Sequence, residues 1–134
     1  MTAEVCYRPS RSALYLPASN ARAIEKARSL PADIVILDLE DAVAPDAKVA
    51  AREAAVAAVG QGGFSADAVA IRANALDTEW GADDLIAIAA SQADAVLVPK
   101  IASASDILNY NATLAGAHPD MQLWAMIETC AAVG

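Results

Sequence analysis

The sequence predicts an α/β fold with parallel strands, and three observations support this prediction. Short apolar runs alternate with helical stretches about five times, at a spacing of roughly 20–35 residues that is typical of strands joined by crossover helices. The runs are apolar at nearly every position, as in strands that are covered on both faces. The chain has 134 residues, of which 57% are hydrophobic, enough for one domain with its own core. We therefore expect a single unit over residues 1–134.

The first half of the chain predicts two strand–helix units. Ser19 or Asn20 can cap the first helix, and Pro31 ends it. Pro45 suits the first turn of the second helix, and the glycine-rich stretch 60–63 ends that helix. The expected elements are a strand at 12–16, a helix at 21–30, a strand at 34–39 and a helix at 46–59.

The side chains of both helices indicate which of their faces is buried. In the first helix we expect the charged residues, Arg28 among them, to lie outside. In the second, the expected apolar side consists of Val49, Ala50, Ala54, Val56 and Ala57. The expected outer side consists of Asp46, Lys48, Arg52 and Glu53.

The second half repeats the pattern but ends within a unit. Thr78 and Ser103 are expected helix caps. The expected elements are strands at 68–73, 94–100 and 121–127, helices at 79–90 and 104–115, and the start of a helix at 129–134. Five units fit either an open doubly wound sheet or part of a (β/α)8 barrel, which usually needs about 250 residues. Because the sequence stops in mid-unit, we expect a fragment or a truncated chain.

Composition and charge exclude several classes of protein. The formal net charge of −8 disfavours binding to nucleic acid or to an anionic membrane surface. No apolar run approaches the ~18 residues of a membrane helix, and no secretory signal is recognisable. Cys6 and Cys130 are isolated and are expected to be reduced thiols. These features predict a cytoplasmic protein.

Charged side chains of both signs follow the predicted strands. In a parallel sheet all these positions lie at the carboxyl edge, where active sites form. They are Asp38, Glu40 and Asp41 after the second strand, Arg72 after the third, Lys100 after the fourth and Glu128 after the fifth. An oxygen-only acidic set suits Mg²⁺, and an arginine can clamp a substrate carboxylate. The sequence has no P-loop, GxGxxG or Ser/His/Asp set.

Each of these residues also has a structural interpretation. Arg72 and Lys100 suit surface ion pairs, and the carboxylates after the second strand suit caps for the following loop. Glu128 suits the N-terminus of a helix. His118 is expected to be exposed, and Trp80 and Trp124 are expected to pack in the interior. The joint arrangement favours a site more than any single residue does.

Five segments together resemble one protein family. They are RSALYLPAS at 11–19, ILDLEDAVAP at 36–45, IRANALDT at 71–78, VPKI at 98–101 and IET at 127–129. In order and spacing they resemble the citrate lyase beta-subunit-like proteins of the HpcH/HpaI aldolase superfamily, which also includes malyl-CoA and citramalyl-CoA lyases. The run ILDLEDAVAP is the most specific of the five.

The resemblance implies a partial (β/α)8 TIM barrel of about five units and a Mg²⁺-dependent carbon–carbon lyase. The implied reaction cleaves a citryl-CoA-like 3-hydroxyacyl thioester, on CoA or an acyl carrier, to a 2-oxo acid and an acyl thioester. It also implies a homo-oligomer. Arg72 would bind the substrate carboxylate and, with Glu40 and Asp41, would be catalytic. Asp38 and Lys100 would contribute to substrate binding, and Glu128 would be a direct Mg²⁺ ligand.

The chain departs from the family pattern in three places. Ala75 stands where the family usually has glycine, and Ala102 stands where an acidic residue is frequent. The family's second metal ligand, an aspartate after the next strand, is missing from the sequence. The alternative is therefore a truncated, inactive half barrel that oligomerises through its open edges, or a module that only binds small anions.

Overall fold

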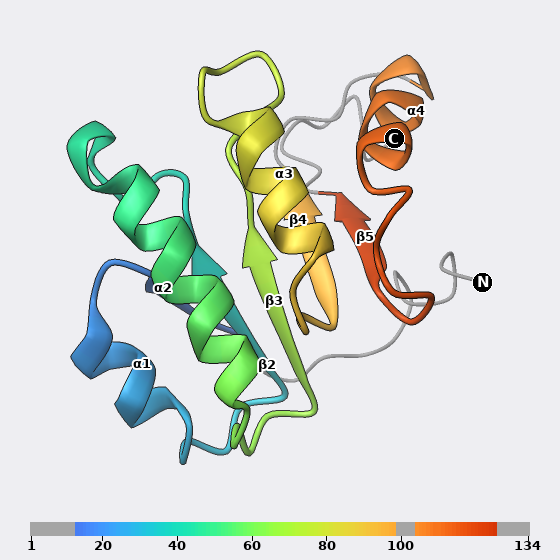
Figure 1. The fold of residues 1–134 in the computed structure, drawn as a ribbon. Helices are drawn as coiled ribbons and strands as arrows, with labels where there is room; N and C mark the ends of the chain where they lie inside the picture. Colours follow the sequence, from blue (N-terminus) through green and yellow to red (C-terminus); the bar gives the residue numbers. More distant parts are fainter. Residues whose placement is uncertain (1–12, 99–103, 126–134) are drawn as a thin grey trace, which may run out of the picture.

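A computed structural model describes residues 13–98 and 104–125, as alternating strands and helices (Figure 1). The strands are β1 (Ala13–Pro17), β2 (Ile34–Asp38), β3 (Ala68–Arg72), β4 (Ala95–Val98) and β5 (Gln122–Ala125). The helices are α1 (Ala21–Ala27), α2 (Lys48–Gln61), α3 (Gly81–Ala89) and α4 (Ala104–Thr113), with the 3-10 turn η2 (Pro45–Ala47) before α2. In this part of the chain no helix is long and apolar enough to cross a membrane.

The five strands form one parallel sheet in the order β1-β2-β3-β4-β5. The register places Pro17 opposite Asp38, and Asp38 opposite Arg72. This confirms the predicted α/β fold with parallel strands. Consecutive barrel units give a sequential order, whereas a doubly wound sheet reverses direction at a switch point. The order therefore favours the barrel over the open sheet.

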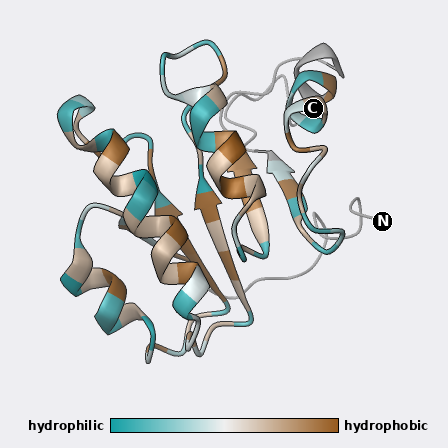
Figure 2. Ribbon diagram, viewed as in Figure 1, coloured by the Kyte–Doolittle hydropathy of each residue, from teal (hydrophilic) through white to brown (hydrophobic). Residues whose placement is uncertain are grey.

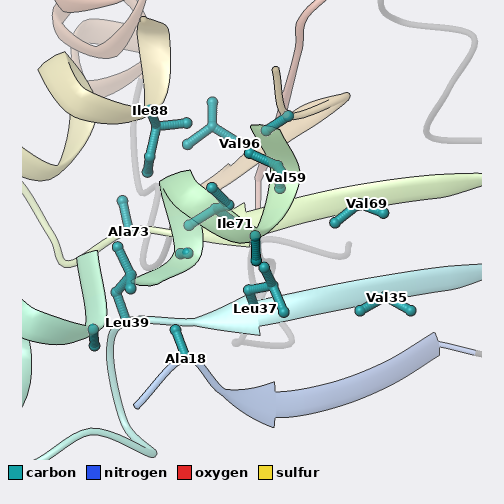
Figure 3. Close-up of a cluster of buried hydrophobic side chains, with 14 of the residues drawn as sticks. Ala18, Val35, Leu37, Leu39, Val59, Val69, Ile71, Ala73, Ile88 and Val96 are labelled. Atoms are coloured by element: carbon teal, nitrogen blue, oxygen red, sulfur yellow. The ribbon is translucent and has the colours of Figure 1, made fainter. Parts of the chain in front are cut away.

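The main core lies between the sheet and the helices that cover one of its faces (Figure 3). Alternate strand residues such as Val35, Leu37 and Ile71 point to this side, where α1, α2 and α3 pack. Hydrophobic colouring is prominent on the strands, behind the helices (Figure 2). The other set of alternate residues forms a smaller cluster of Ile36, Ala70, Ala95 and Leu97 on the opposite face.

Helix α2 buries a different side from the one that its sequence predicted. The buried residues are Lys48, Ala51, Ala55, Ala58 and Val59. Val49 is 52% exposed, whereas Lys48 is only 6% exposed. The prediction was wrong because alanines were available on every side of the helix, so hydrophobicity alone did not select a face. The small side chains of Ala51 and Ala55 let the helix lie close against the sheet.

The ends of the first two helices are fixed by polar side chains. Asn20 caps α1 as predicted, since its side-chain oxygen accepts from the amide of Ala23 at 3.0 Å. Arg28 is not exposed as expected, because its guanidinium donates to the carbonyl oxygens of Ala58 (3.4 Å) and Gly62 at the end of α2. It also lies over the ring of Phe64 at 4.6 Å. His118 is half-buried rather than exposed, with Nε2 2.9 Å from the carbonyl oxygen of Ala93.

Candidate functional site

Asp38 and Arg72 form a buried ion pair at the carboxyl edge of the sheet. They end neighbouring strands in paired register, so both side chains lie on the same face. Nε and Nη2 of Arg72 each donate to one carboxylate oxygen of Asp38 at 2.8 Å. The exposed fractions are 2% for Asp38 and 6% for Arg72. This two-point contact fixes the plane of the guanidinium.

The carboxylate of Asp38 also accepts two backbone hydrogen bonds. The amide of Glu40 donates to Oδ1 at 2.8 Å, and the amide of Ala42 donates to Oδ2 at 3.1 Å. Burial on its own would raise the pKa of Asp38. The hydrogen bonds from Arg72, Glu40 and Ala42, together with the charge of Arg72, outweigh burial and lower that pKa below its usual value of 3.8. Asp38 is therefore ionised and supports both the arginine and the loop after β2.

Two further carboxylates face the other end of the guanidinium. Nη1 of Arg72 lies 3.4 Å from an oxygen of Glu40, and Nη2 lies 3.8 Å from an oxygen of Asp41. The side chain of Glu40 is 15% exposed and that of Asp41 is 80% exposed. The hydrogen bonds to Asp38 raise the pKa of Arg72 against the opposing effect of burial, and the charges of Asp38, Glu40 and Asp41 add to the rise. We call these four residues the Arg72 cluster.

The ring of Tyr15 lies beside the guanidinium of Arg72. Its centroid lies 5.5 Å from the guanidinium carbon of Arg72, which is cation–π distance. Tyr15 comes from β1 and is 47% exposed. The site therefore combines residues of β1, β2 and β3, and part of it faces solvent.

The donor atoms of the cluster fit the kind of metal that the sequence predicted. Three carboxylates against one guanidinium leave a formal charge of −2, and every anionic donor is oxygen. Mg²⁺ takes one or two protein carboxylates together with water and substrate oxygens. Within the described ranges no three His, Cys, Asp or Glu side chains form a metal-binding group by themselves. The cluster thus fits a supporting role beside a metal-coordinating residue from elsewhere in the site.

The structure brings four of the six predicted site residues together. Arg72 contacts Asp38, Glu40 and Asp41, as their positions after neighbouring strands predicted. Lys100 and Glu128 lie outside the described residues. The structural interpretation of Asp38 as a loop cap also applies, because its carboxylate accepts from the loop amides of Glu40 and Ala42 while it binds Arg72.

A polar network behind the cluster was not predicted as part of the site. The ammonium of Lys48 donates to the carbonyl oxygens of Leu39 (3.0 Å) and Glu40 (2.9 Å). The side-chain amide of Asn74 donates to the carbonyl oxygen of Leu39 (2.9 Å) and to the buried carboxylate of Asp84 (2.6 Å).

Asp84 and Arg52 extend this network to the helices. Nε of Arg52 donates to Asp84 at 2.8 Å, which joins α2 to α3. The prediction that Lys48 and Arg52 lie outside α2 is therefore wrong, since both turn inward to buried acceptors. The available signal was spacing: these two cations are four residues apart and share one side of a helix.

Comparison with known proteins extends the similarity along nearly the whole chain. The family model described as HpcH/HpaI aldolase/citrate lyase matches residues 11–133. The chain belongs to the HpcH/HpaI aldolase/citrate lyase family. This confirms the resemblance noted in the sequence, and the Arg72 cluster lies within the matched region.

Members of this family with curated descriptions include two kinds of enzyme. The (3S)-malyl-CoA thioesterase of Cereibacter sphaeroides is 46% identical over 121 residues, which cover 90% of this chain and 41% of the relative. Citrate lyase subunit beta of Escherichia coli is 38% identical over 102 residues, or 76% of this chain and 34% of the relative. The chain thus spans less than half the length of these relatives, which differ in reaction class.

Solved structures of the family share the fold. The citrate lyase beta subunit of M. tuberculosis in complex with oxaloacetate and magnesium aligns with a TM-score of 0.70 and 32% identity, over 92% of this chain and 49% of that one. A second structure from M. tuberculosis, with magnesium, acetoacetate and coenzyme A, aligns with a TM-score of 0.68 and 32% identity, over 91% of this chain and 41% of that one. These family structures therefore contain magnesium, oxo acids and coenzyme A.

Proposed function

We propose that this chain supplies part of the active site of a Mg²⁺-dependent carbon–carbon lyase. Its substrate would be a 3-hydroxyacyl-CoA thioester, and its products a 2-oxo acid and an acyl-CoA. The observation that carries the proposal is the Arg72 cluster, a fixed guanidinium beside excess carboxylates at the carboxyl edge of the sheet. The citrate lyase relative supports the reaction class.

Arg72 would bind the carboxylate of the acid half of the substrate. Asp38 holds the Nε and Nη2 side of the guanidinium at 2.8 Å. The contacts at the Nη1 and Nη2 end, with Glu40 and Asp41, are longer, at 3.4 and 3.8 Å. A ligand carboxylate that approaches this end replaces weak contacts and leaves the strong pair with Asp38 intact. Asp38 thus contributes to substrate binding through Arg72.

Glu40 and Asp41 would serve the cation that accompanies the substrate. Glu128 would coordinate Mg²⁺ directly. The carboxylates of Glu40 and Asp41 would hold water molecules bound to the metal or shape the pocket around it. The metal supplies an electrophile that stabilises negative charge developing on the substrate oxygen. Lys100 would contribute to substrate binding.

The reaction is balanced without any redox partner. The bond between the hydroxyl-bearing carbon and the carbon next to the thioester breaks. The hydroxyl loses its proton and becomes the oxo group of the 2-oxo acid. The electron pair passes to the acyl-CoA enolate, which takes up a proton at carbon. Arg72 keeps the carboxylate of the acid half in place throughout.

A thioesterase is the second candidate, because the relative at 46% identity carries that activity. In this reaction water attacks the thioester carbonyl, and the products are a hydroxy acid and free CoA. Arg72 would bind the same substrate carboxylate in both reactions. The two candidates therefore differ in their products and share the site.

Product analysis of the full-length protein tests the proposal. Malyl-CoA, citramalyl-CoA and citryl-CoA are each incubated with Mg²⁺ or with EDTA. We expect a 2-oxo acid and an acyl-CoA, no turnover in EDTA, and a loss of about 100-fold in kcat/KM for Arg72→Lys, in which the two-point contact is missing. Free CoA with a hydroxy acid indicates the thioesterase instead. Cleavage that is insensitive to both EDTA and Arg72→Lys would refute either form of the site.

A further inference from the structure

Directly after β2, the backbone amide and carbonyl groups of Leu39 and Glu40 are all hydrogen-bonded. The amide of Leu39 donates to the carbonyl oxygen of Arg72 at 2.9 Å, and the amide of Glu40 donates to Asp38 at 2.8 Å. The carbonyl oxygen of Leu39 accepts from Asn74 and Lys48, and that of Glu40 accepts from Lys48 and from the amide of Val43 at 3.1 Å. Leu39 and Glu40 join Asp38 to Asp41, so their backbone hydrogen bonds set where the carboxylates of the Arg72 cluster point.

Lys48 is the one side chain that bonds both of these carbonyl oxygens among the described residues. It is the first residue of α2 and is 6% exposed. Its ammonium also lies 5.0 Å from the ring centroid of Trp80. None of these three partners carries a formal charge, so no ion pair among them offsets the cost of burying the ammonium. An apolar side chain of similar length would fill the same space without that cost. The ammonium therefore has a role that an apolar side chain cannot perform, which is to direct the two carbonyl groups.

The partners of the Leu39 carbonyl are themselves anchored. Asn74 is held through its side-chain amide and its backbone amide, both of which donate to Asp84, at 2.6 and 3.0 Å. Asp84 is fully buried and accepts from Arg52. The loop after β2 is therefore fixed from α2 by Lys48 and, through Asn74, from α3.

We propose that Lys48 is a positioning residue for the Arg72 cluster. By holding the carbonyl groups of Leu39 and Glu40, it fixes the direction in which Glu40 and Asp41 leave β2 toward Arg72. Lys48 touches neither substrate nor metal. The consequence for ligand binding rests on the proposed function, whereas the consequence for the loop does not.

Three variants of the protein test the effect on the loop. Lys48→Met keeps an unbranched side chain of nearly the same length but removes the ammonium, with its donors and its contact with the Trp80 ring. Lys48→Arg keeps a cation, and Lys26→Met makes the same change at an exposed position of α1. Amide hydrogen exchange is followed by NMR at Glu40, Ala42 and Val43, with Val35 and Leu37 of β2 as internal references.

We expect exchange at the three loop amides to accelerate at least tenfold in Lys48→Met, with unchanged rates at Val35 and Leu37. Lys26→Met should match the wild type, and Lys48→Arg should restore most of the protection. A uniform acceleration at loop and strand amides, or no acceleration at the loop, would overturn the proposal, since Lys48 would then only stabilise the fold.

The affinity for pyruvate in the presence of Mg²⁺ gives the second readout. We expect the dissociation constant per folded molecule to rise about tenfold in Lys48→Met and to recover in Lys48→Arg. If the wild type binds pyruvate and Lys48→Met binds it with the same dissociation constant, the positioning role of Lys48 is overturned. If the wild type itself does not bind pyruvate, the proposed function fails, and the exchange rates alone decide the role of Lys48.

Discussion

At the residue scale, the pair Asp38–Arg72 is the centre of the site. Two charges at 2% and 6% exposure are stable only because each has several hydrogen-bond partners. The pair also links β2 to β3 and orders the loop that carries Glu40 and Asp41. Its electrostatics therefore determine both the stability of this edge and the shape of the site.

Asp38→Asn tests this pair through the pH dependence of stability. Because the folded protein lowers the pKa of Asp38, the stabilisation is fully present above the unfolded value of about 3.8 and is lost as pH falls through the lower folded pKa. We expect Asn to cost about 3 kcal/mol of unfolding free energy at pH 7. The difference from the wild type should shrink below about pH 4, as the wild-type carboxyl takes up its proton.

Urea denaturation at a series of pH values measures this difference. The matched control is Asp120→Asn, a change at an exposed turn, for which we expect less than about 0.5 kcal/mol at any pH. A difference for Asp38→Asn that stays constant down to pH 2 would contradict the assigned pKa shift.

Single residues also mark where prediction from the sequence succeeded and failed. Asp38 and Arg72 were predicted as neighbours because each ends a strand, and parallel strands end at a common edge. Lys48, Asn74 and Asp84 were missed as part of the site, because charged and amide side chains are usually solvated. Only the fold reveals that buried carbonyl groups lie within reach of Lys48.

At the element scale, the helices place the site through close contacts with the sheet and its loops. The turn at 75–78 folds against the start of α3, where a Cβ on Gly81 would lie 2.0 Å from the carbonyl oxygen of Ala75. Thr78 binds the same turn, accepting from the amide of Gly81 at 3.1 Å and donating to Ala75 at 2.6 Å. This turn connects Asn74 to Asp84, so its packing supports the network behind the Arg72 cluster.

Gly81→Ala tests this contact. The new methyl group would collide with backbone atoms that cannot move without displacing the turn, and we expect a loss of about 2–3 kcal/mol in unfolding free energy. Gly60→Ala is the matched control, because it lies in α2 with open space around its Cβ position. There we expect a gain of about 0.5 kcal/mol from helix propensity. Equal effects of the two substitutions in thermal melts would show that Gly81 is not sterically restricted.

The elements themselves were more predictable than their orientation. Apolar runs, turn signals and the cap Asn20 located all five strands and four helices of the described part within a few residues. The predicted cap Thr78 was wrong, since Trp80 is the N-cap residue of α3. The buried side of α2 was not predictable, because alanine is compatible with a core and with a surface. Contacts with the sheet, at Ala51 and Ala55, decide the orientation.

At the scale of the whole molecule, the described strands form one parallel sheet in sequential order, the arrangement that consecutive barrel units give. Within the described residues, β1 pairs only with β2, and β5 pairs only with β4. Strand edges with unpaired backbone groups associate with other strands. The alternative noted from the sequence, an inactive half barrel that oligomerises, therefore remains a prediction about the isolated 134-residue chain.

Sedimentation velocity measures this association. We expect the isolated chain to form species heavier than 13.7 kDa, with a proportion that increases with protein concentration. A monomer at every concentration would contradict association through the strand edges. The domain extent of 1–134 likewise remains a prediction.

In the proposed site, Arg72 binds the carboxylate of a 2-oxo acid, and Glu40 and Asp41 serve Mg²⁺. Titration calorimetry of pyruvate into the full-length protein, with Mg²⁺ or EDTA, measures this binding. We expect binding with Mg²⁺, no detectable binding in EDTA, and an affinity about 100-fold weaker in Arg72→Lys, equivalent to about 2.7 kcal/mol. Pyruvate binding of equal strength in wild type and Arg72→Lys would contradict the account.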